Sequence, residues 1–116
     1  MTPLRLLTEP VSRLDLTSLA EEGFGDMVKA VVDVRREIMV IGGELHSDEE
    51  AALLNDGSDQ RDLWGINLHP AESGEGMIEF DSMINVRPKQ GNRSRDVEDG
   101  STRERIRSIV ARWVVN

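Results

Sequence analysis

The chain has 116 residues, no cysteine, and a formal net charge of −8 from 22 acidic and 14 basic side chains. This length favours a single domain over residues 1–116. The lack of cysteine excludes a disulfide scaffold, cysteine-ligated zinc, an iron–sulfur cluster and a thiol nucleophile. The acidic balance and the low aromatic content (two Trp, two Phe, no Tyr) disfavour nucleic acid as a partner.

The hydropathy pattern argues against membrane association. No apolar run approaches the ~20 residues that a membrane-spanning helix requires. Arg5 and Glu9 interrupt the apolar stretch at the N-terminus, which therefore does not resemble a signal peptide. We expect a soluble, cytoplasmic protein.

The first part of the chain predicts a strand, a helix and a hairpin. A short apolar run over 4–7 is expected to form the first strand. Ser12 begins a capping box, and the apolar spacing that follows predicts a helix over 13–22. Runs rich in β-branched residues over 27–34 and 38–41 predict the two strands of a hairpin.

The second part of the chain predicts a helix, two strands and a final helix. Ser47–Glu50 has the pattern of a capping box, and Gly57 is expected to end the helix that follows. Residues 62–69 and 77–87 are predicted strands. Ser101–Glu104 is a second capping box before a helix with one apolar face, formed by Ile106, Ile109, Val110, Trp113 and Val114.

This order of elements predicts the fold class. The expected order is strand–helix–strand–strand–helix–strand–strand–helix, an α+β fold with one mixed or antiparallel sheet of about five strands. Because each helix has one apolar stripe, the three helices are expected to pack mainly on one face of the sheet. Two strand–helix–strand units resemble a ferredoxin-like sandwich, extended by one strand and a C-terminal helix.

Polar side chains recur along one side of the two later strands. Alternation places six of them on a common face: Asn67, His69, Glu79, Asp81, Asn85 and Arg87. One interpretation is the solvent-exposed outer face of an antiparallel sheet. The other is a ligand-binding surface, which the choice of Asn and Asp favours because both are poor strand residues.

The net charge divides unevenly along the chain. Residues 1–86 carry 18 acidic and 6 basic side chains, whereas residues 87–116 carry 4 acidic and 8 basic ones. The basic loop, residues 87–95, has four cations and no acid. With two asparagines of the polar face, it supplies the candidate anion ligands Arg87, Lys89, Gln90, Gly91, Asn92, Arg93, Ser94, Arg95, Asn67 and Asn85. Alternatively, the loop arginines pair with this protein's own carboxylates.

Catalytic and metal-binding residues are less clearly indicated. Glu79 and Asp81, two residues apart on a predicted strand, could act as a general acid and base. His46 and His69 could hold a metal ion together with Glu44 and Asp81. Their spacing matches no metal-binding motif, and we expect no cofactor.

Several stretches of this sequence are similar to those of a known family. They cover 24–34, 42–50, 62–68, 79–88 and 90–95. Together they resemble a small prokaryotic family of uncharacterised proteins, catalogued only as a domain of unknown function. The resemblance extends over nearly the whole chain and implies one compact domain. It supplies no activity, ligand or catalytic residue.

The leading functional hypothesis from the sequence is binding of an anionic or phosphate-bearing small molecule by the basic loop and the adjoining polar sheet face. One alternative is a hydrolase-type enzyme that uses Glu79 and Asp81, or a metal held by the histidines. Another is a non-catalytic interaction module or homo-oligomer, in which the acidic and basic parts of the chain associate.

Overall fold

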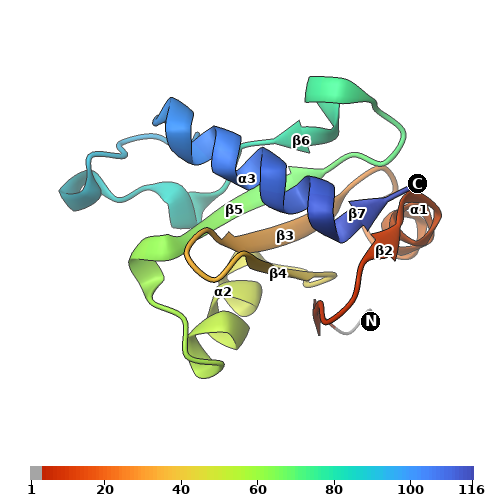
Figure 1. Cartoon of the computed structure of the whole chain (residues 1–116), viewed down its shortest axis with the longest axis horizontal. Helices are drawn as coiled ribbons and strands as arrows, with labels where there is room; N and C mark the ends of the chain where they lie inside the picture. The colour runs from red at the N-terminus through yellow and green to blue at the C-terminus, as the bar shows by residue number, and fades with distance from the viewer. Residues whose placement is uncertain (1–3) are drawn as a thin grey trace.

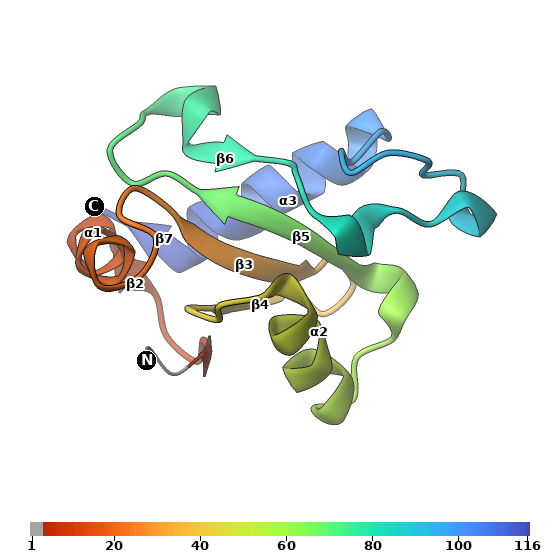
Figure 2. The same ribbon diagram turned by 180° about the vertical axis from the view of Figure 1, so that it is seen from behind.

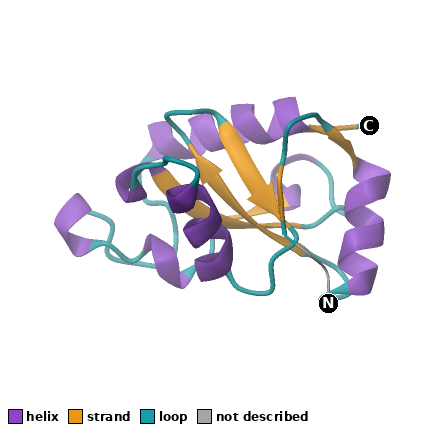
Figure 3. Cartoon of the chain, turned by 90° about the horizontal axis from the view of Figure 1, so that it is seen from below, coloured by secondary structure: helices purple, strands orange, loops and turns teal. Residues whose placement is uncertain are grey.

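A five-stranded antiparallel sheet with strand order β1-β4-β3-β5-β6 organises the computed structural model, which describes residues 4–116 (Figure 1). Its strands are Arg5–Leu6 (β1), Val28–Asp33 (β3), Ile38–Ile41 (β4), Leu63–Leu68 (β5) and Ile78–Glu79 (β6). The long central strands β3 and β5 are buried along almost their whole length because helices cover both faces of the sheet. Figure 3 shows the strands lying between helices.

The three helices are Arg13–Glu22 (α1), His46–Asn55 (α2) and Gly100–Trp113 (α3). α3 covers one face of the sheet, and α1 closes the same apolar core at its end (Figure 1). α2 covers the opposite face, where a smaller core forms from Val31, Val40, Leu53 and Leu63 (Figure 2). In the part of the chain that the structure describes, no helix has the length and apolar composition needed to cross a bilayer.

The strand order explains why helices lie on both faces. α2 connects β4 to β5, which flank β3, and α1 lies between β1 and β3, which flank β4. Both crossovers therefore run in the same direction across the sheet, but they start from antiparallel strands. Crossovers of one hand then place their helices on opposite faces. In a ferredoxin-like sandwich the two crossovers run in opposite directions and the helices share a face, so the strand order here differs in that respect.

The predicted α+β class is confirmed, as are the hairpin of β3 and β4 and the strand β5. The first helix has the predicted bounds and capping box. The Ser12 hydroxyl accepts a hydrogen bond from the Asp15 amide (3.0 Å), and the Asp15 carboxylate accepts one from the Ser12 amide (3.3 Å). Local sequence was sufficient there because the box satisfies the helix terminus without tertiary contacts.

The other two predicted capping boxes are wrong. α2 begins at His46, and its N-cap Leu45 makes no side-chain hydrogen bond, so Ser47 lies inside the helix. Burial of His46 and Glu49 decides this start, since the Glu49 carboxyl accepts a hydrogen bond from the Gly43 amide (3.0 Å). α3 begins earlier than predicted, at Gly100, because Asp99 rather than Ser101 is its N-cap.

The Asp99 carboxylate accepts hydrogen bonds from the Thr102 amide (2.9 Å) and from the Ser101 and Thr102 hydroxyls. The far end of α3 also differs from expectation. Val114, predicted on the helical face, belongs to a two-residue strand, Val114–Val115 (β7), that pairs in parallel with Val11–Ser12 (β2). This pairing joins the start of the first helix to the end of the last.

The predicted strand over 77–87 is also wrong beyond Glu79. β6 contains only Ile78–Glu79, and the chain then leaves the sheet and forms a 3-10 turn over Met83–Asn85. The Asn85 side-chain amide makes the hydrogen bonds that a neighbouring strand would otherwise make with β5. Its Oδ1 accepts from the Gly65 N–H (2.8 Å), and its Nδ2 donates to the Gly65 carbonyl (2.9 Å). Asn85 and Arg87 therefore do not belong to the polar sheet face on which alternation had placed them.

Candidate functional site

A polar cleft of about 350 Å³ opens between the first turn of α2 and the sheet. Its polar lining comes from parts of the chain that are distant in sequence. The lining includes the charged and polar side chains of Lys29, His46, Asn67, Glu79, Asp81 and Arg95. Leu45 and Met83 line the same cleft and are 55% and 67% exposed, so the polar site has an apolar rim.

Strand register builds the floor of the cleft. Lys29 on β3 pairs with Asn67 on β5, and Asn67 pairs with Glu79 on β6. Paired residues on neighbouring strands point to the same side of a sheet, so these three form a polar row on the face that α2 covers. The alternation of β5 therefore placed Asn67 correctly. Lys29 was missed, although a charged residue between the apolar Val28 and Ala30 of a predicted strand was a usable signal.

Both candidate acid–base carboxylates already have partners. Glu79 Oε1 lies 3.1 Å from His69 Nε2 and accepts a hydrogen bond from Asn67 Nδ2 at 3.1 Å. The bonds with His69 and Asn67, in that order, lower the pKa of Glu79. Asp81 forms an ion pair with Arg95, with 2.6 Å between Asp81 Oδ1 and Arg95 Nε. The lowered pKa of Glu79 disfavours a proton held there for acid catalysis at neutral pH, and Asp81 is engaged by Arg95.

His46 is held in one tautomer by the backbone. Its ring is buried, and Nε2 lies 2.8 Å from the carbonyl oxygen of Ile66. A carbonyl oxygen only accepts hydrogen bonds, so Nε2 carries the proton and Nδ1 is an acceptor in the neutral ring. Desolvation is the largest influence and lowers the pKa of His46, while the nearby Asn67 side chain, which could accept a hydrogen bond from the charged ring, acts in the opposite direction.

Asn67 presents a second acceptor beside His46. Its Nδ2 donates to Glu79 Oε1 (3.1 Å) and to the backbone oxygen of Asp81 (3.3 Å), which determines the orientation of the amide. The other end of the amide, Oδ1, is buried and accepts no hydrogen bond from any described residue. A buried, unpaired carbonyl oxygen is costly, so this part of the cleft lacks one hydrogen-bond donor.

The basic loop satisfies most of its hydrogen-bonding groups internally. The Arg87 guanidinium donates to the backbone oxygens of Gln60 (2.7 Å), Ile84 (3.0 Å) and Leu63, and its centre lies 4.5 Å from the centre of the Trp64 ring. Burial lowers the pKa of Arg87. Arg87 therefore supports the fold and does not line the cleft.

Two buried asparagines shape the rest of the loop. Asn92 Nδ2 donates to the backbone oxygens of Asn85 (2.7 Å), Ser94 (3.1 Å) and Asp96 (2.7 Å), and its Oδ1 accepts from the Glu98 amide (2.9 Å). Asn85 Nδ2 donates to the carbonyl oxygen of Arg95 in the same segment (2.9 Å). These contacts give the loop one conformation.

The backbone amides that would attract an anion in this loop are occupied by a carboxylate of the same chain. Glu98 accepts hydrogen bonds from the amides of Arg93 (3.0 Å) and Ser94 (2.8 Å) and from the Ser94 hydroxyl (2.6 Å). Gln90 donates to a backbone oxygen (3.0 Å), and Gly91 has a φ of 85° that closes the turn. Lys89 and Arg93 are exposed, and no carboxylate of residues 4–116 lies within 4.0 Å of either. Of the basic loop, Arg95 alone lines the cleft.

The candidate metal ligands do not gather. Across residues 4–116, no group of three or more histidine and carboxylate side chains is placed to hold a metal ion. His46 and Asp81 line the polar cleft, whereas His69 does not and Glu44 lines a different cavity.

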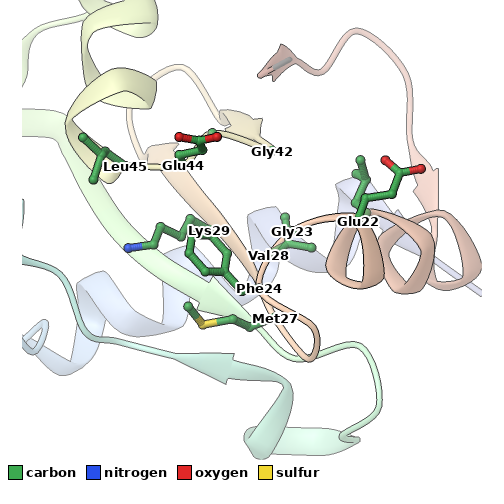
Figure 4. Close-up of a pocket in the computed structure, with 11 residues that line it drawn as sticks. Glu22, Gly23, Phe24, Met27, Val28, Lys29, Gly42, Glu44 and Leu45 are labelled. Carbon is green, nitrogen blue, oxygen red and sulfur yellow. The ribbon is translucent and has the colours of Figure 1, made fainter. Parts of the chain in front are cut away.

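That second cavity adjoins the first and is mostly apolar. Its volume is about 520 Å³, and Met27, Lys29 and Leu45 line both cavities. Figure 4 shows the Lys29 side chain beside the Phe24 ring, with Glu22 on the far side of the cavity. The Lys29 ammonium lies 5.2 Å from the centre of that ring, a cation–π distance. Lys29 therefore stands where the polar and apolar cavities meet.

Comparison with known proteins identifies the chain's family. A family model described as a protein of unknown function, DUF5674, matches residues 5–113. The chain belongs to the DUF5674 family. No curated protein and no solved structure matches it. The resemblance to a domain of unknown function is thereby confirmed, and the function of the DUF5674 chain must be inferred from its own geometry.

Proposed function

We propose that this DUF5674 protein binds a small anionic ligand in the polar cleft. One observation carries the proposal: Lys29 and Arg95 line the same cleft as the N-terminus of α2, and no side chain caps that terminus. A helix N-terminus carries roughly half a positive charge and exposes amide donors, which attract anions.

The surrounding contacts support this assignment. Within residues 4–116, no carboxylate lies within 4.0 Å of the Lys29 ammonium. Arg95 contacts Asp81 through Nε, and its two terminal amino groups make no hydrogen bond to a described residue. The neighbouring carboxylate Glu79 is bonded to His69 and Asn67. Both cations can therefore donate to a ligand without breaking an ion pair.

The basic loop has a supporting role in this proposal. Because Glu98 holds the amides of Arg93 and Ser94, the loop contributes to the ligand site only through Arg95. The anion hypothesis from the sequence is thus kept, but its site moves from the loop to the cleft. We further expect binding to take place in the cytoplasm, since a chain without cysteine needs no oxidising compartment.

A thermal-shift screen with inorganic phosphate and short-chain carboxylates tests the proposal. A ligand at one hundred times its dissociation constant should stabilise the protein by about 2.7 kcal/mol. Lys29→Met and Arg95→Met should abolish that stabilisation. Lys89→Met and Arg93→Met remove matched cations outside the cleft and should preserve it. Equal responses in all four variants, or no response of the native protein to any anion, would refute binding in the cleft.

A further inference from the structure

His46 and Asn67 line the same cleft, and the Asn67 side chain lies close enough to the His46 ring to raise its pKa. His46 Nδ1 is an acceptor because Nε2 donates to the Ile66 carbonyl, and Asn67 Oδ1 has no partner because Nδ2 is used by Glu79 and Asp81. Both residues are more than nine-tenths buried. The arrangement lacks one donor, and the burial of Oδ1 keeps water from supplying it.

A proton on His46 would complete the network. The ring would then donate from Nε2 to Ile66 and from Nδ1 to Asn67, which leaves no unpaired acceptor. What opposes protonation is the cost of a buried positive charge, because desolvation is the main influence on this ring.

The charged groups near the ring are closely balanced. Lys29 on β3 repels a charged His46, and Asp81 after β6 attracts it. Glu79 and Arg95 complete the charged lining, so the cleft carries two cations and two carboxylates while His46 is neutral. An anion held by Lys29 and the start of α2 would add negative charge beside His46, since His46 is the first residue of that helix. That added charge favours protonation.

We propose that the cleft takes up its anion together with one proton, which moves onto His46 Nδ1 and bonds Asn67 Oδ1. This inference rests on the proposed anion binding and names the ligand class: a small monoanion, such as the conjugate base of a carboxylic acid. With His46 protonated, the cleft carries one net positive charge, which a monoanion neutralises.

Nuclear magnetic resonance of the native protein tests both proposals separately, with sodium acetate as the probe and sodium chloride at equal ionic strength as the control. The Ser47 amide reports anion binding, and the ring nitrogens of His46 report protonation. We expect acetate to shift the Ser47 amide and to raise the pH at which His46 titrates. If the amide shifts and the His46 titration does not, proton uptake is refuted and anion binding stands. If neither responds, both proposals fail.

Two histidine variants give a matched second measurement. His46→Gln keeps an amide donor for the Ile66 carbonyl but cannot take up a proton. His69→Gln removes the other histidine, which does not line the cleft, and the glutamine amide can still donate to Glu79. In the native protein and in His69→Gln, acetate affinity should rise by up to about tenfold per unit of falling pH across the titration range of His46. In His46→Gln that dependence should disappear, and a retained dependence would overturn the proposal.

Discussion

The basic loop and the polar cleft differ in how completely their polar atoms are bonded. Among residues 4–116, four buried side-chain oxygens accept no hydrogen bond, and none of them belongs to the loop. One is Asn67 Oδ1 in the cleft, and another is Glu49 Oε1, one turn beyond His46 on α2. The basic loop has four cationic side chains and the cleft has two, yet an unpaired buried side-chain oxygen lies in the cleft and none lies in the loop (residues 87–95). Of the four oxygens, Asn67 Oδ1 is the one that lines the cleft, which is why the proposed ligand site lies there and not in the loop.

The basic C-terminal segment shows the same internal bonding. Arg112 pairs with Glu37 (2.9 Å) and Arg95 with Asp81 (2.6 Å), both across the two parts of the chain, and Arg107 pairs with Glu104 within the segment. Arg105 donates to a backbone oxygen of the hairpin. The opposite charges of the two halves thus meet within one chain. Association of two molecules through these charges remains a proposal from the sequence.

The largest effect is expected from a substitution that disrupts the basic loop. Asn85→Ala removes two buried hydrogen bonds with Gly65 and one partly buried hydrogen bond to the Arg95 carbonyl. Because the backbone groups would stay buried and unpaired, we expect the free energy of unfolding to fall by about 4 kcal/mol. Urea denaturation measures it. Asn55→Ala, at an exposed position in α2, should cost less than about 0.5 kcal/mol. A loss below about 1 kcal/mol for Asn85→Ala would contradict this account of the loop.

The next effect concerns the scaffold of the cleft. Burial raises the pKa of Glu49 to about 9, against a hydrogen bond from Gly43 that lowers it. The native state therefore keeps a proton that the unfolded chain loses near pH 4.5. Stability is fully present below that pH and falls as pH rises toward about 9. Glu49→Gln should remove this dependence and stabilise the protein by about 3 kcal/mol at pH 7.

Denaturation at several pH values checks this prediction. The matched control is Asp48→Asn, which neutralises the preceding, exposed carboxylate of the same helix. Its stability should follow the native pH dependence. Parallel curves for the native protein and Glu49→Gln would show that Glu49 is ionised in the folded state.

A smaller effect tests how the segment after β6 packs on the cleft floor. A methyl group on Gly65 would lie 2.6 Å from Ser82 Cβ, closer than packed atoms allow. We expect Gly65→Ala to destabilise the protein by about 2 kcal/mol through overpacking, and to weaken anion binding because Ser82 lines the cleft. Gly100→Ala, which has open space at the start of α3, should be neutral in both thermal unfolding and ligand titration. Equal stability of the two variants would refute the close packing.

The smallest expected effect separates loop from cleft most directly. Arg93 is exposed and forms no ion pair with a described carboxylate, and only its backbone amide contacts Glu98. Arg93→Ala should change the free energy of unfolding by less than about 0.5 kcal/mol, and phosphate or carboxylate affinity should not change. Urea denaturation and calorimetric titration measure both. A marked loss of affinity would restore the loop as the anion site.

Much of the fold was predictable where short-range patterns were sufficient. The α+β class, the hairpin, the first helix with its capping box, and β5 with Asn67 on the polar face all followed from local patterns. These features depend on neighbouring residues or on period-two alternation, which a sequence displays directly. The site residues His46, Asn67, Glu79, Asp81 and Arg95 were also named from the sequence, although for several different roles.

Long-range contacts decided the rest. The start of α2 depends on Glu49 reaching Gly43, and β6 ends early because Asn85 binds the backbone of Gly65. Which cations remain available depends on whether a carboxylate or carbonyl from a distant segment meets them. The amino-acid sequence by itself determined the residue types of a charged site and the strands that carry part of it. Only the tertiary structure decided which polar atoms stay unpaired, because desolvation and hydrogen bonding act through neighbours in space.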